Sequence, residues 1–511
     1  MTSTFIIPLL RSTRCARLFL PLLFFPLSLL PVEADQDLRQ AEAMRIYLHA
    51  QKLMSEDKLD QAIKEFQTVA STFSKTDIAD EAFLEIAHCW TKKGHFNWAV
   101  DNLQTIISEY PSSNSAPEAS FRLGELYENR AFQDFSLEES YGNFARVFDV
   151  YPDSPRANEA LLRAGNSLAL QGQWLEAVPL FRRLLFQSAG SRFSSDGWLF
   201  LGQSLALTGH PLDAMKAIQR VGGQHHEGAS FTRVRAQGWN TQLYRFHVIP
   251  HSMGLRPMSL ALDPIPRRAA VMAFDPNGKL LLVDNERKAL VVYSREGKQE
   301  KLHALPNPGR ALSVDPLGGW LVACGSCVVQ DGRSIRFRPT TSDKYIEPKD
   351  LKRISLATIQ ANGNLFLGVS GGKGLYRFDT QRNVLDSSFP PNVPGKILDV
   401  TLDPTGRICL LFSQGRGLLA RYDLNGKKID QVHGSALKSK RLTRLTVSPL
   451  GYFYLLDGRS QEVLILGSSL DLISRISLHD LGIHKGSQLA VHPDGTLHVL
   501  DSRTGKIFRL E

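Results

Sequence analysis

The sequence has 511 residues, of which 43% are hydrophobic and 22% are charged. These fractions lie near the averages of globular proteins and exclude a largely disordered or membrane-filling chain. The chain is longer than a single-core domain usually is, so we expect at least two domains. The formal net charge is +9, with −5 over residues 35–250 and +12 over residues 251–511. The C-terminal half therefore favours anionic partners.

Residues 1–34 have the features of an export signal. Three arginines precede an apolar run from Leu18 to Leu30, and Val32-Glu33-Ala34 supplies small residues for cleavage. The run is shorter than the roughly 20 residues that span a bilayer, so we predict cleavage and no stable transmembrane anchor afterwards. Cys15 lies before the run, which argues against a lipid-modified mature N-terminus. The predicted location is periplasmic or secreted, which makes nucleic acid a poor candidate partner.

Four cysteines follow this segment, namely Cys89, Cys324, Cys327 and Cys409. Two of them form a Cys-x-x-Cys motif at residues 324–327, a spacing that thioredoxin-type redox motifs share. The flanking residues are strand-like and Gly325-Ser326 is typical of a two-residue hairpin turn. We therefore expect a buried thiol pair or a local turn disulfide rather than redox catalysis.

The N-terminal half repeats one helical pattern five times. Small residues recur at two positions of each copy, and the first series is spaced by 37, 37, 41 and 37 residues. The first series is Ala50, Ala87, Gly124, Gly165 and Gly202, and the second is Ala62, Ala99, Ser140, Ala177 and Ala214. A period this regular predicts a solenoid of antiparallel helix pairs, in which small residues let the two helices approach closely.

Larger residues follow the second small position by four residues, on the same helical face, and are expected to fill the space between the helices. They are Phe66, Leu103, Phe144, Phe181 and Ile218. Acidic residues recur in the first helical turns at Glu81, Glu118, Glu159 and Asp196, where the helix dipole favours them. Ser115 followed by Glu118 predicts a serine cap at one helix start.

These residues resemble the tetratricopeptide repeat family, and the longer period is similar to that of bacterial envelope proteins such as the outer-membrane assembly lipoprotein and the periplasmic Tol-Pal coordinator. The resemblance implies a concave groove, built by the first helix of each pair, that binds an extended peptide. The groove-facing positions it implies are Tyr47, Gln51, Leu84, His88, Phe121, Glu125, Leu162, Asn166, Leu199 and Gln203. The alternative is that the apolar members only pack and the polar ones are only solvated.

The strand-rich C-terminal half repeats an apolar run, a turn ending in glycine, and a second apolar run. The turn glycines are spaced by 40, 45, 43, 45 and 44 residues, at Gly278, Gly318, Gly363, Gly406, Gly451 and Gly495. This period predicts six propeller blades of four strands each. The last copy is about one strand short, so a segment before Val271 is expected to close the ring.

The repeated strand–turn–strand pattern resembles the NHL-type six-bladed propeller, with Asp284, Asp457 and Asp501 ending the second strands of three blades. Some six-bladed propellers are enzymes that use carboxylates and histidines around the central channel. His484, His492 and His498 lack a second ligand cluster at short spacing, so we expect no metal and no cofactor. The aspartates are more simply strand-end residues.

One basic segment stands out between the fourth and fifth copies. Its cations are Lys438, Lys440, Arg441 and Arg444. A charge run of this kind is usually a solvated loop, but in a domain of net charge +12 it is the best candidate anion-binding site.

The sequence thus predicts a multidomain α + β protein, with a signal peptide over 1–34, five helical repeats over 35–222, a capping helix and linker over 223–265, and a six-bladed propeller over 266–511. We expect a non-enzymatic interaction scaffold of the bacterial cell envelope that binds an envelope protein or peptide and an anionic surface or polysaccharide. The alternative is a propeller enzyme, a metal-dependent lyase or lactone hydrolase, tethered by the repeats. A third possibility is that the two oppositely charged halves pack as one rigid body.

Overall fold

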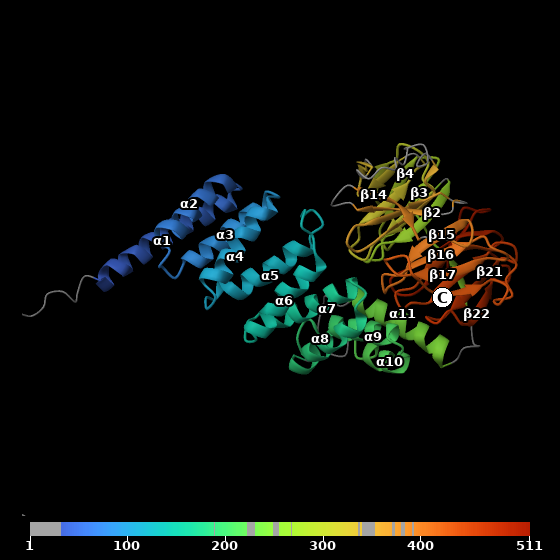
Figure 1. Cartoon of the computed structure of the whole chain (residues 1–511), viewed down its shortest axis with the longest axis horizontal. Helices are drawn as coiled ribbons and strands as arrows, with labels where there is room; N and C mark the ends of the chain where they lie inside the picture. Colours follow the sequence, from blue (N-terminus) through green and yellow to red (C-terminus); the bar gives the residue numbers. More distant parts are fainter. Residues whose placement is uncertain are drawn as a thin grey trace, which may run out of the picture. The chain divides into compact units, whose positions relative to one another are not determined.

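The computed structural model describes residues 32–510, apart from 189, 222–229, 249–254, 267, 326, 336–337, 340–352, 370–371, 373, 380–383 and 391–392. The predicted export signal lies almost wholly outside these residues. The described chain forms a tetratricopeptide-like helical region followed by a six-bladed β-propeller, which confirms the predicted fold class (Figure 1). No helix in this part of the chain is long and apolar enough to cross a membrane. The chain divides into two compact units, Met1–Cys89 and Trp90–Glu511.

The helices follow one another in antiparallel pairs. In chain order they are α1 Val32–Ser55, α2 Leu59–Thr72, α3 Ala79–Lys92, α4 Phe96–Glu109, α5 Ser115–Glu128, α6 Leu137–Val150, α7 Ala157–Leu170, α8 Trp174–Gln187, α9 Ser194–Leu207, α10 Pro211–Ile218 and α11 Ser230–His247. Ser115 is the first residue of α5, and Asn114 precedes it without a side-chain cap. The predicted serine cap is therefore wrong here, whereas Ser136 caps α6 by accepting from the Glu139 N–H.

Small residues hold the paired helices together as the sequence predicts. A Cβ atom added at Gly124, Gly165 or Gly202 would lie 2.6, 2.5 or 2.4 Å from the side chain that faces it. The facing side chains are Phe144, Phe181 and Ile218, and all three are buried. The close approach lets each large residue fill the space that a small residue leaves, so larger side chains at these glycines would push the helices apart.

The propeller is made of six sheets among the described residues. Blades one and two are β2 Ala269–Phe274, β3 Leu280–Asp284, β4 Ala289–Tyr293, β5 Gln299–Ala304, and β6 Ala311–Val314, β7 Trp320–Ala323, β8 Val328–Gln330, β9 Arg333–Ser334. Blade three is β11 Leu356–Ile359, β12 Leu365–Gly368, β13 Leu375–Asp379, β14 Val384–Phe389, with β10 Arg338–Pro339 added in parallel beside β14. Blades four and five are β15 Ile397–Leu402, β16 Ile408–Phe412, β17 Leu418–Tyr422, β18 Lys428–His433, and β19 Leu442–Val447, β20 Phe453–Asp457, β21 Glu462–Leu466, β22 Leu472–Ser477.

The sixth blade closes the ring. It contains β23 Gly486–Val491, β24 Leu497–Asp501, β25 Ile507–Leu510 and, from the segment before the first copy, β1 Pro257–Ser259. β1 pairs antiparallel with β25, with Met258 opposite Arg509. The prediction that an earlier segment completes the last blade is confirmed, and the pairing leaves β25 no open edge.

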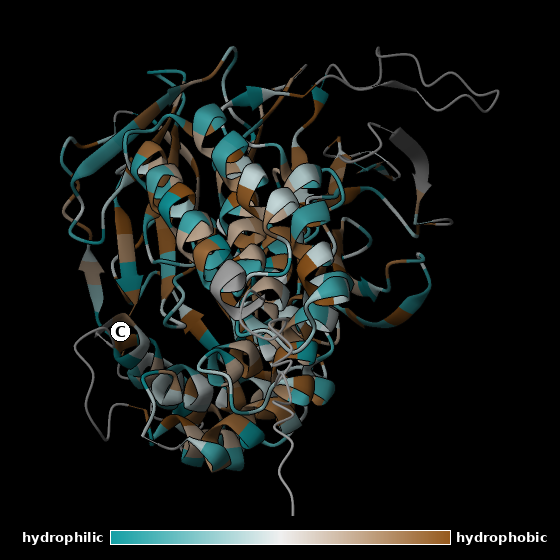
Figure 2. Ribbon diagram, turned by 90° about the vertical axis from the view of Figure 1, so that its left-hand side faces the viewer, coloured by the Kyte–Doolittle hydropathy of each residue, from teal (hydrophilic) through white to brown (hydrophobic). Residues whose placement is uncertain are grey.

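Burial explains why the second strands have continuous apolar sequences. Every residue of β3, β16, β20 and β24 is buried, whereas β5 and β18 at the outer edge of their blades are mostly exposed. Figure 2 shows the hydrophobic residues along the propeller strands and their mixture with hydrophilic residues around the helices. Neighbouring blades thus cover both faces of each inner strand.

Candidate functional site

Six glycine turns form one face of the propeller, which we call the turn face. Each follows the first strand of a blade, and its glycine has a φ between +77° and +91°. The second residue of the turn is Pro276, Pro316, Ala361, Pro404, Pro449 or Pro493. The positive φ is a conformation that only glycine adopts without strain, which explains why the glycine recurs in every copy.

Side chains from the helical region donate hydrogen bonds to the carbonyls of four of these turns, in consecutive blades. The donors and acceptors are Arg130 Nε to Ala361 O at 3.0 Å, Trp174 Nε1 to Pro404 O at 2.8 Å, Gln203 Nε2 to Pro449 O at 2.9 Å, and Trp239 Nε1 to Pro493 O at 2.7 Å. We call this set of contacts the seam. Successive parts of the helical region therefore contact successive blades, with at least one donor to each of blades three to six.

An ion pair strengthens the start of the seam. The Arg130 guanidinium pairs with the fully buried carboxylate of Asp315, in the turn of blade two. Burial raises the pKa of Asp315, and the neighbouring Arg130 cation opposes that rise. A buried carboxylate of this kind depends on its partner, because an unpaired charge in this position would be costly.

Two glycines on the helical side allow the backbones to touch. A Cβ atom at Gly172 would lie 2.3 Å from the carbonyl oxygen of Thr405, and one at Gly238 would lie 2.2 Å from that of Asp494. Trp239, next to Gly238, is fully buried. The same hydrophobic cluster that holds Trp239 also contains Leu450 of the fifth blade, so the core is continuous across the seam.

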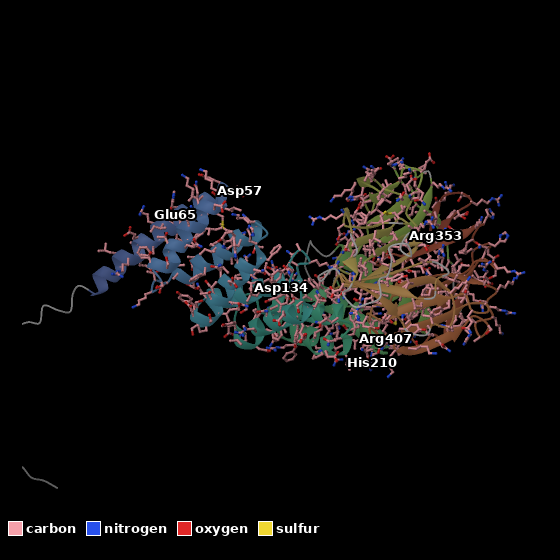
Figure 3. The ribbon with its side chains drawn as sticks, turned by 45° about the horizontal axis from the view of Figure 1, so that its top comes forward. Asp57, Glu65, Asp134, His210, Arg353 and Arg407 are labelled. Carbon is pink, nitrogen blue, oxygen red and sulfur yellow. A yellow bond between two sulfur atoms is a disulfide. The ribbon has the colours of Figure 1, made fainter. Side chains whose placement is uncertain are left out.

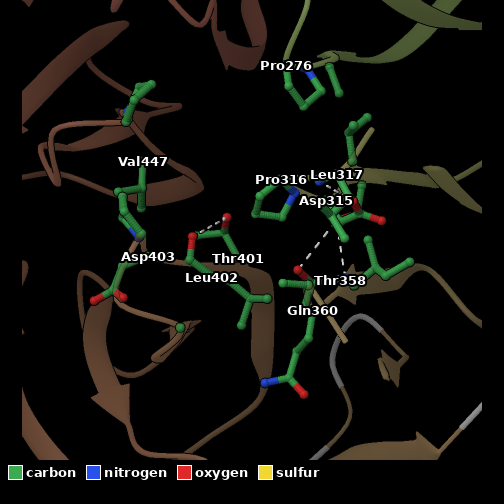
Figure 4. Close-up of a pocket in the computed structure, with 18 of the residues that line it drawn as sticks. Pro276, Asp315, Pro316, Leu317, Thr358, Gln360, Thr401, Leu402, Asp403 and Val447 are labelled. Atoms are coloured by element: carbon green, nitrogen blue, oxygen red, sulfur yellow. Dashed lines mark hydrogen bonds between the residues drawn. The ribbon is translucent and has the colours of Figure 1, made fainter. Parts of the chain in front are cut away.

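The seam surrounds a cavity of about 1240 Å³ along the propeller axis. Its walls are the first strands of the blades and the turn residues, and Figure 4 shows Pro276, Pro316, Asp403 and Val447 around the opening. On the helical side Asn166 of α7, Gln203 of α9, and Phe231 and Arg235 of α11 line it. Helices and propeller therefore enclose one common space.

The groove positions before Trp90 lie on α1 and α3. Tyr47 is buried, its ring centroid is 5.3 Å from that of Phe66, and burial raises its pKa. Gln51, Leu84 and His88 are partly exposed, and His88 Nδ1 lies 3.5 Å from the Glu85 carboxylate. Tyr47 thus packs in the first helix pair, while the other three side chains reach the surface.

The groove positions after Trp90 divide into packing residues and residues that face the propeller. Phe121, Leu162 and Leu199 are buried among the helices. Glu125 lies 3.4 Å from the Arg163 guanidinium, and burial raises its pKa. Gln203 is part of the seam and Asn166 lines the cavity, so in these repeats the propeller itself faces the inner helices.

Three residues of the seam lie outside the ten groove positions. Arg130 follows the end of α5, Trp174 begins α8, and Trp239 lies in α11 beyond the fifth repeat. They occupy different positions of the helical unit, so no periodic signal marks them. The one signal available from the sequence is that two are tryptophans at positions where the repeat needs none.

The basic segment lies at the opposite end of blade five from the turn face. Lys438, Lys440 and Arg441 are exposed just before β19, whose other end leads into the Ser448–Gly451 turn. Arg444 lies on β19 and lines the cavity, near Asp399. Burial raises the pKa of Asp399, and the cation of Arg444 opposes this rise. The four candidate cations therefore belong to two places, and Figure 3 shows other cationic side chains, such as Arg353 and Arg407, on the propeller.

The strand-end aspartates have structural partners. Asp457 is fully buried and accepts hydrogen bonds from the backbone N–H groups of Arg441, Arg459 and Ser460. Burial alone would raise its pKa, but these donors together lower it. Among the described residues no three His, Cys, Asp or Glu side chains are placed to hold a metal ion.

Histidines and cysteines of the propeller are also engaged. His492 Nδ1 lies 2.9 Å from Asp494 Oδ1, and the ring of His498 is buried against Phe274. Burial lowers the pKa of His498 to about 3. Cys324 and Cys327 form a disulfide between β7 and β8, in agreement with the turn-disulfide expectation.

Comparison with protein families supports the helical half. Residues 39–169 match the model of the outer membrane lipoprotein family YfiO, and residues 159–185 match a tetratricopeptide repeat model. The N-terminal region thus carries repeats of the envelope-lipoprotein type, as the resemblance implied. No curated protein matches the chain.

Several solved structures resemble about half of the chain. A streptogramin B lyase is 11% identical, with a TM-score of 0.39 over 50% of this chain and 97% of its own. Virginiamycin B lyase from Staphylococcus aureus is 11% identical, with a TM-score of 0.37 over 50% of this chain and 99% of its own. A protein described as a putative gluconolactonase is 16% identical, with a TM-score of 0.38 over 50% of this chain and 92% of its own. Similarity at this level carries no argument about activity.

Proposed function

We propose that the protein is a non-enzymatic interaction scaffold of the bacterial cell envelope, exported through a cleaved signal peptide. The observation that carries the proposal is the seam, in which four side chains of successive helical elements hold four successive blades. A propeller held in this way is a fixed platform for a second partner. The match of residues 39–169 to an outer membrane lipoprotein family supports the periplasmic side of the envelope as its location.

In this proposal the peptide-binding groove is formed by the first repeats. Gln51 and His88 lie at groove positions on α1 and α3 and are partly exposed. The corresponding positions of the later repeats, such as Gln203, contact the propeller instead. An extended segment of an envelope protein would bind along the first helices, as is typical of tetratricopeptide repeats.

Photo-crosslinking tests the groove. A photoreactive amino acid is placed at Gln51 or His88 of the full chain, and at exposed Lys64 on α2 as a control, in cells that export the protein. The proposal predicts the same protein adduct from both groove positions and none from position 64. Equal adducts from all three positions, or none from the groove, would contradict it.

The second surface is the basic segment. Lys438, Lys440 and Arg441 are exposed at the propeller end that lies away from the seam, so they suit an anionic envelope surface or polysaccharide. Vesicles that contain an anionic phospholipid and a soluble acidic polysaccharide are the two probes. Replacing the three cations by glutamate should abolish salt-sensitive binding to at least one probe while leaving the groove adducts unchanged. Retention of binding by this variant would exclude the segment as the anion-binding surface.

A further inference from the structure

The cavity enclosed by the seam is lined by a cation that forms no direct ion pair within the described part of the chain. Arg235 of α11 lines the cavity, and its guanidinium carbon lies 4.8 Å from the ring centroid of Trp239 and 5.8 Å from that of Phe200. Its Nε atom is buried and has no hydrogen-bond partner. Within the described part of the chain, no hydrogen bond or ion pair reaches this side chain.

The carboxylate of Asp196 acts on Arg235 through its charge, which opposes the effect of burial on the pKa of Arg235, but it forms no ion pair with it. Asp196 instead accepts a hydrogen bond of 2.8 Å from Thr232 Oγ1. In the cavity wall, Asp315 pairs with Arg130, and Asp399 accepts from the Leu445 N–H at 2.9 Å. Burial lowers the pKa of Arg235 to about 10, so the guanidinium remains charged at neutral pH.

Physical chemistry makes this arrangement unfavourable for the empty protein. A partly buried guanidinium that no carboxylate contacts directly loses part of its hydration, and stacking on two aromatic rings offsets about 2 kcal/mol or less of that cost. An anionic group beside Arg235 would remove the remaining cost and gain charge-assisted hydrogen bonds. Arg235 is therefore suited to binding rather than to stability.

The surroundings define what kind of anion would fit. Phe200 and Phe231 contribute apolar ring atoms to the wall, and Asn166 contributes an amide. The cavity, at about 1240 Å³, is large enough for a small organic molecule. We propose that this composite cavity binds a small organic anion, whose carboxylate or phosphate group pairs with Arg235 while its apolar body lies against Phe200 and Phe231. This site is distinct from the proposed peptide groove and does not depend on it.

Calorimetric titration of the full chain tests the proposal. The probes are 4-phenylbutyrate as a carboxylate with an apolar body, inorganic phosphate, and neutral 4-phenylbutanol. We expect saturable binding of at least one anion at one site per chain, and the anion that binds identifies the headgroup chemistry. Arg235→Met should weaken this binding roughly tenfold or more, because it removes the charged hydrogen-bond donor.

Arg233→Met is the matched control, because Arg233 lies on the same helix but is exposed; it should change affinity by less than about twofold. Arg235→Lys keeps the charge without the planar fork and should bind between wild type and Arg235→Met. Without ligand, Arg235→Met should melt at or above the wild-type temperature, and the anion should raise the melting temperatures of wild type and Arg233→Met more than that of Arg235→Met. The proposal is overturned if neither anion binds wild type, if 4-phenylbutanol binds as tightly as 4-phenylbutyrate, or if the Met variants of Arg233 and Arg235 behave alike.

Discussion

The polar groups at the two ends of the propeller blades find their hydrogen-bond partners in different ways. At the turn face, carbonyls such as that of Pro493 are hydrogen-bonded by side chains from the helices. At the opposite end, the aspartates that terminate second strands accept N–H groups of their own blade, as Asp457 does from Arg459. At the turn face the hydrogen-bond donors come from the helical region, whereas at the opposite end they come from the same blade.

This difference shows where a propeller of this kind can be joined to a second element. A turn whose second residue is proline has a carbonyl acceptor but no N–H at that position, so an indole or amide donor can dock there without competing with the sheet. The strand-end aspartate instead satisfies its local donors and leaves only charged loops, such as residues 438–441, for outside partners.

The largest effect should come from removing the most buried donor. Trp239→Ala deletes a fully buried indole and its hydrogen bond of 2.7 Å to Pro493 O. We expect a loss of about 3–5 kcal/mol in the free energy of unfolding, measured by urea denaturation, because of the cavity that remains. Trp98→Ala, at a tryptophan that is 49% exposed, is the control and should cost less than about 1 kcal/mol. Equal losses from both variants would contradict the role of the seam.

The next effect concerns pH. His498 has its pKa lowered to about 3 in the folded protein by burial, against an ordinary value near 6.5 when unfolded. Between pH 6.5 and 3 the unfolded chain binds a proton at His498 and the folded chain does not. The stability that is present above pH 6.5 is therefore lost as the pH falls toward 3. Each pH unit well inside this window costs about 1 kcal/mol, which amounts to about 2 kcal/mol between pH 6.5 and 4.5.

The variant His498→Leu separates this contribution from other titrating groups. Its unfolding free energy should fall less steeply with decreasing pH than that of wild type, by about 1 kcal/mol per unit. His479 is exposed, so His479→Leu should keep the wild-type slope. An unchanged slope in His498→Leu would show that this histidine is not held neutral.

A glycine substitution distinguishes the seam from ordinary helix packing. Alanine normally stabilises a helix relative to glycine by about 1 kcal/mol. Gly142→Ala in α6 should follow this rule, because no atom lies within 4 Å of the added Cβ. Gly238→Ala in α11 should instead destabilise by about 1–3 kcal/mol, since its Cβ would meet the Asp494 carbonyl. Stabilisation by both variants in thermal unfolding would rule out the close approach.

The smallest effect isolates one hydrogen bond. Trp174→Phe keeps most of the ring but removes the Nε1 donor that reaches Pro404 O at 2.8 Å. A loss of about 1 kcal/mol is expected in urea denaturation, because the carbonyl is left without its donor. Trp198→Phe on α9, whose ring stacks under Arg220, serves as a comparison outside the seam and should cost less. A larger loss in Trp198→Phe would mean that the seam bond contributes little.

Periodicity accounts for most of what the sequence could predict about the fold. The series of small residues predicted the helix pairs, because a residue as small as Gly165 leaves room for Phe181 of the facing helix when the two helices touch. The turn glycines predicted the six blades, because the same turn position in every copy needs a positive φ. Each of these signals is local and repeats.

The seam could not be predicted because its donors follow no common spacing. Arg130, Trp174 and Trp239 lie 231, 230 and 254 residues from their acceptors in the sequence. The recurring acidic residues show the same limit. Glu118 and Glu159 lie in first helical turns, as the helix dipole favours, yet both also pair with Arg156, so charge also links one repeat to the next. Long-range partners of this kind leave no mark in a single sequence.

Hydrogen–deuterium exchange of the full chain and its Gly238→Ala variant tests the central claim most directly. If the seam joins helices and blades into one cooperative body, the variant should exchange faster both in α11 and in the strands of blade six, β23 and β24. Faster exchange confined to α11, with blade six unchanged, would contradict the claim that the helical repeats hold the propeller.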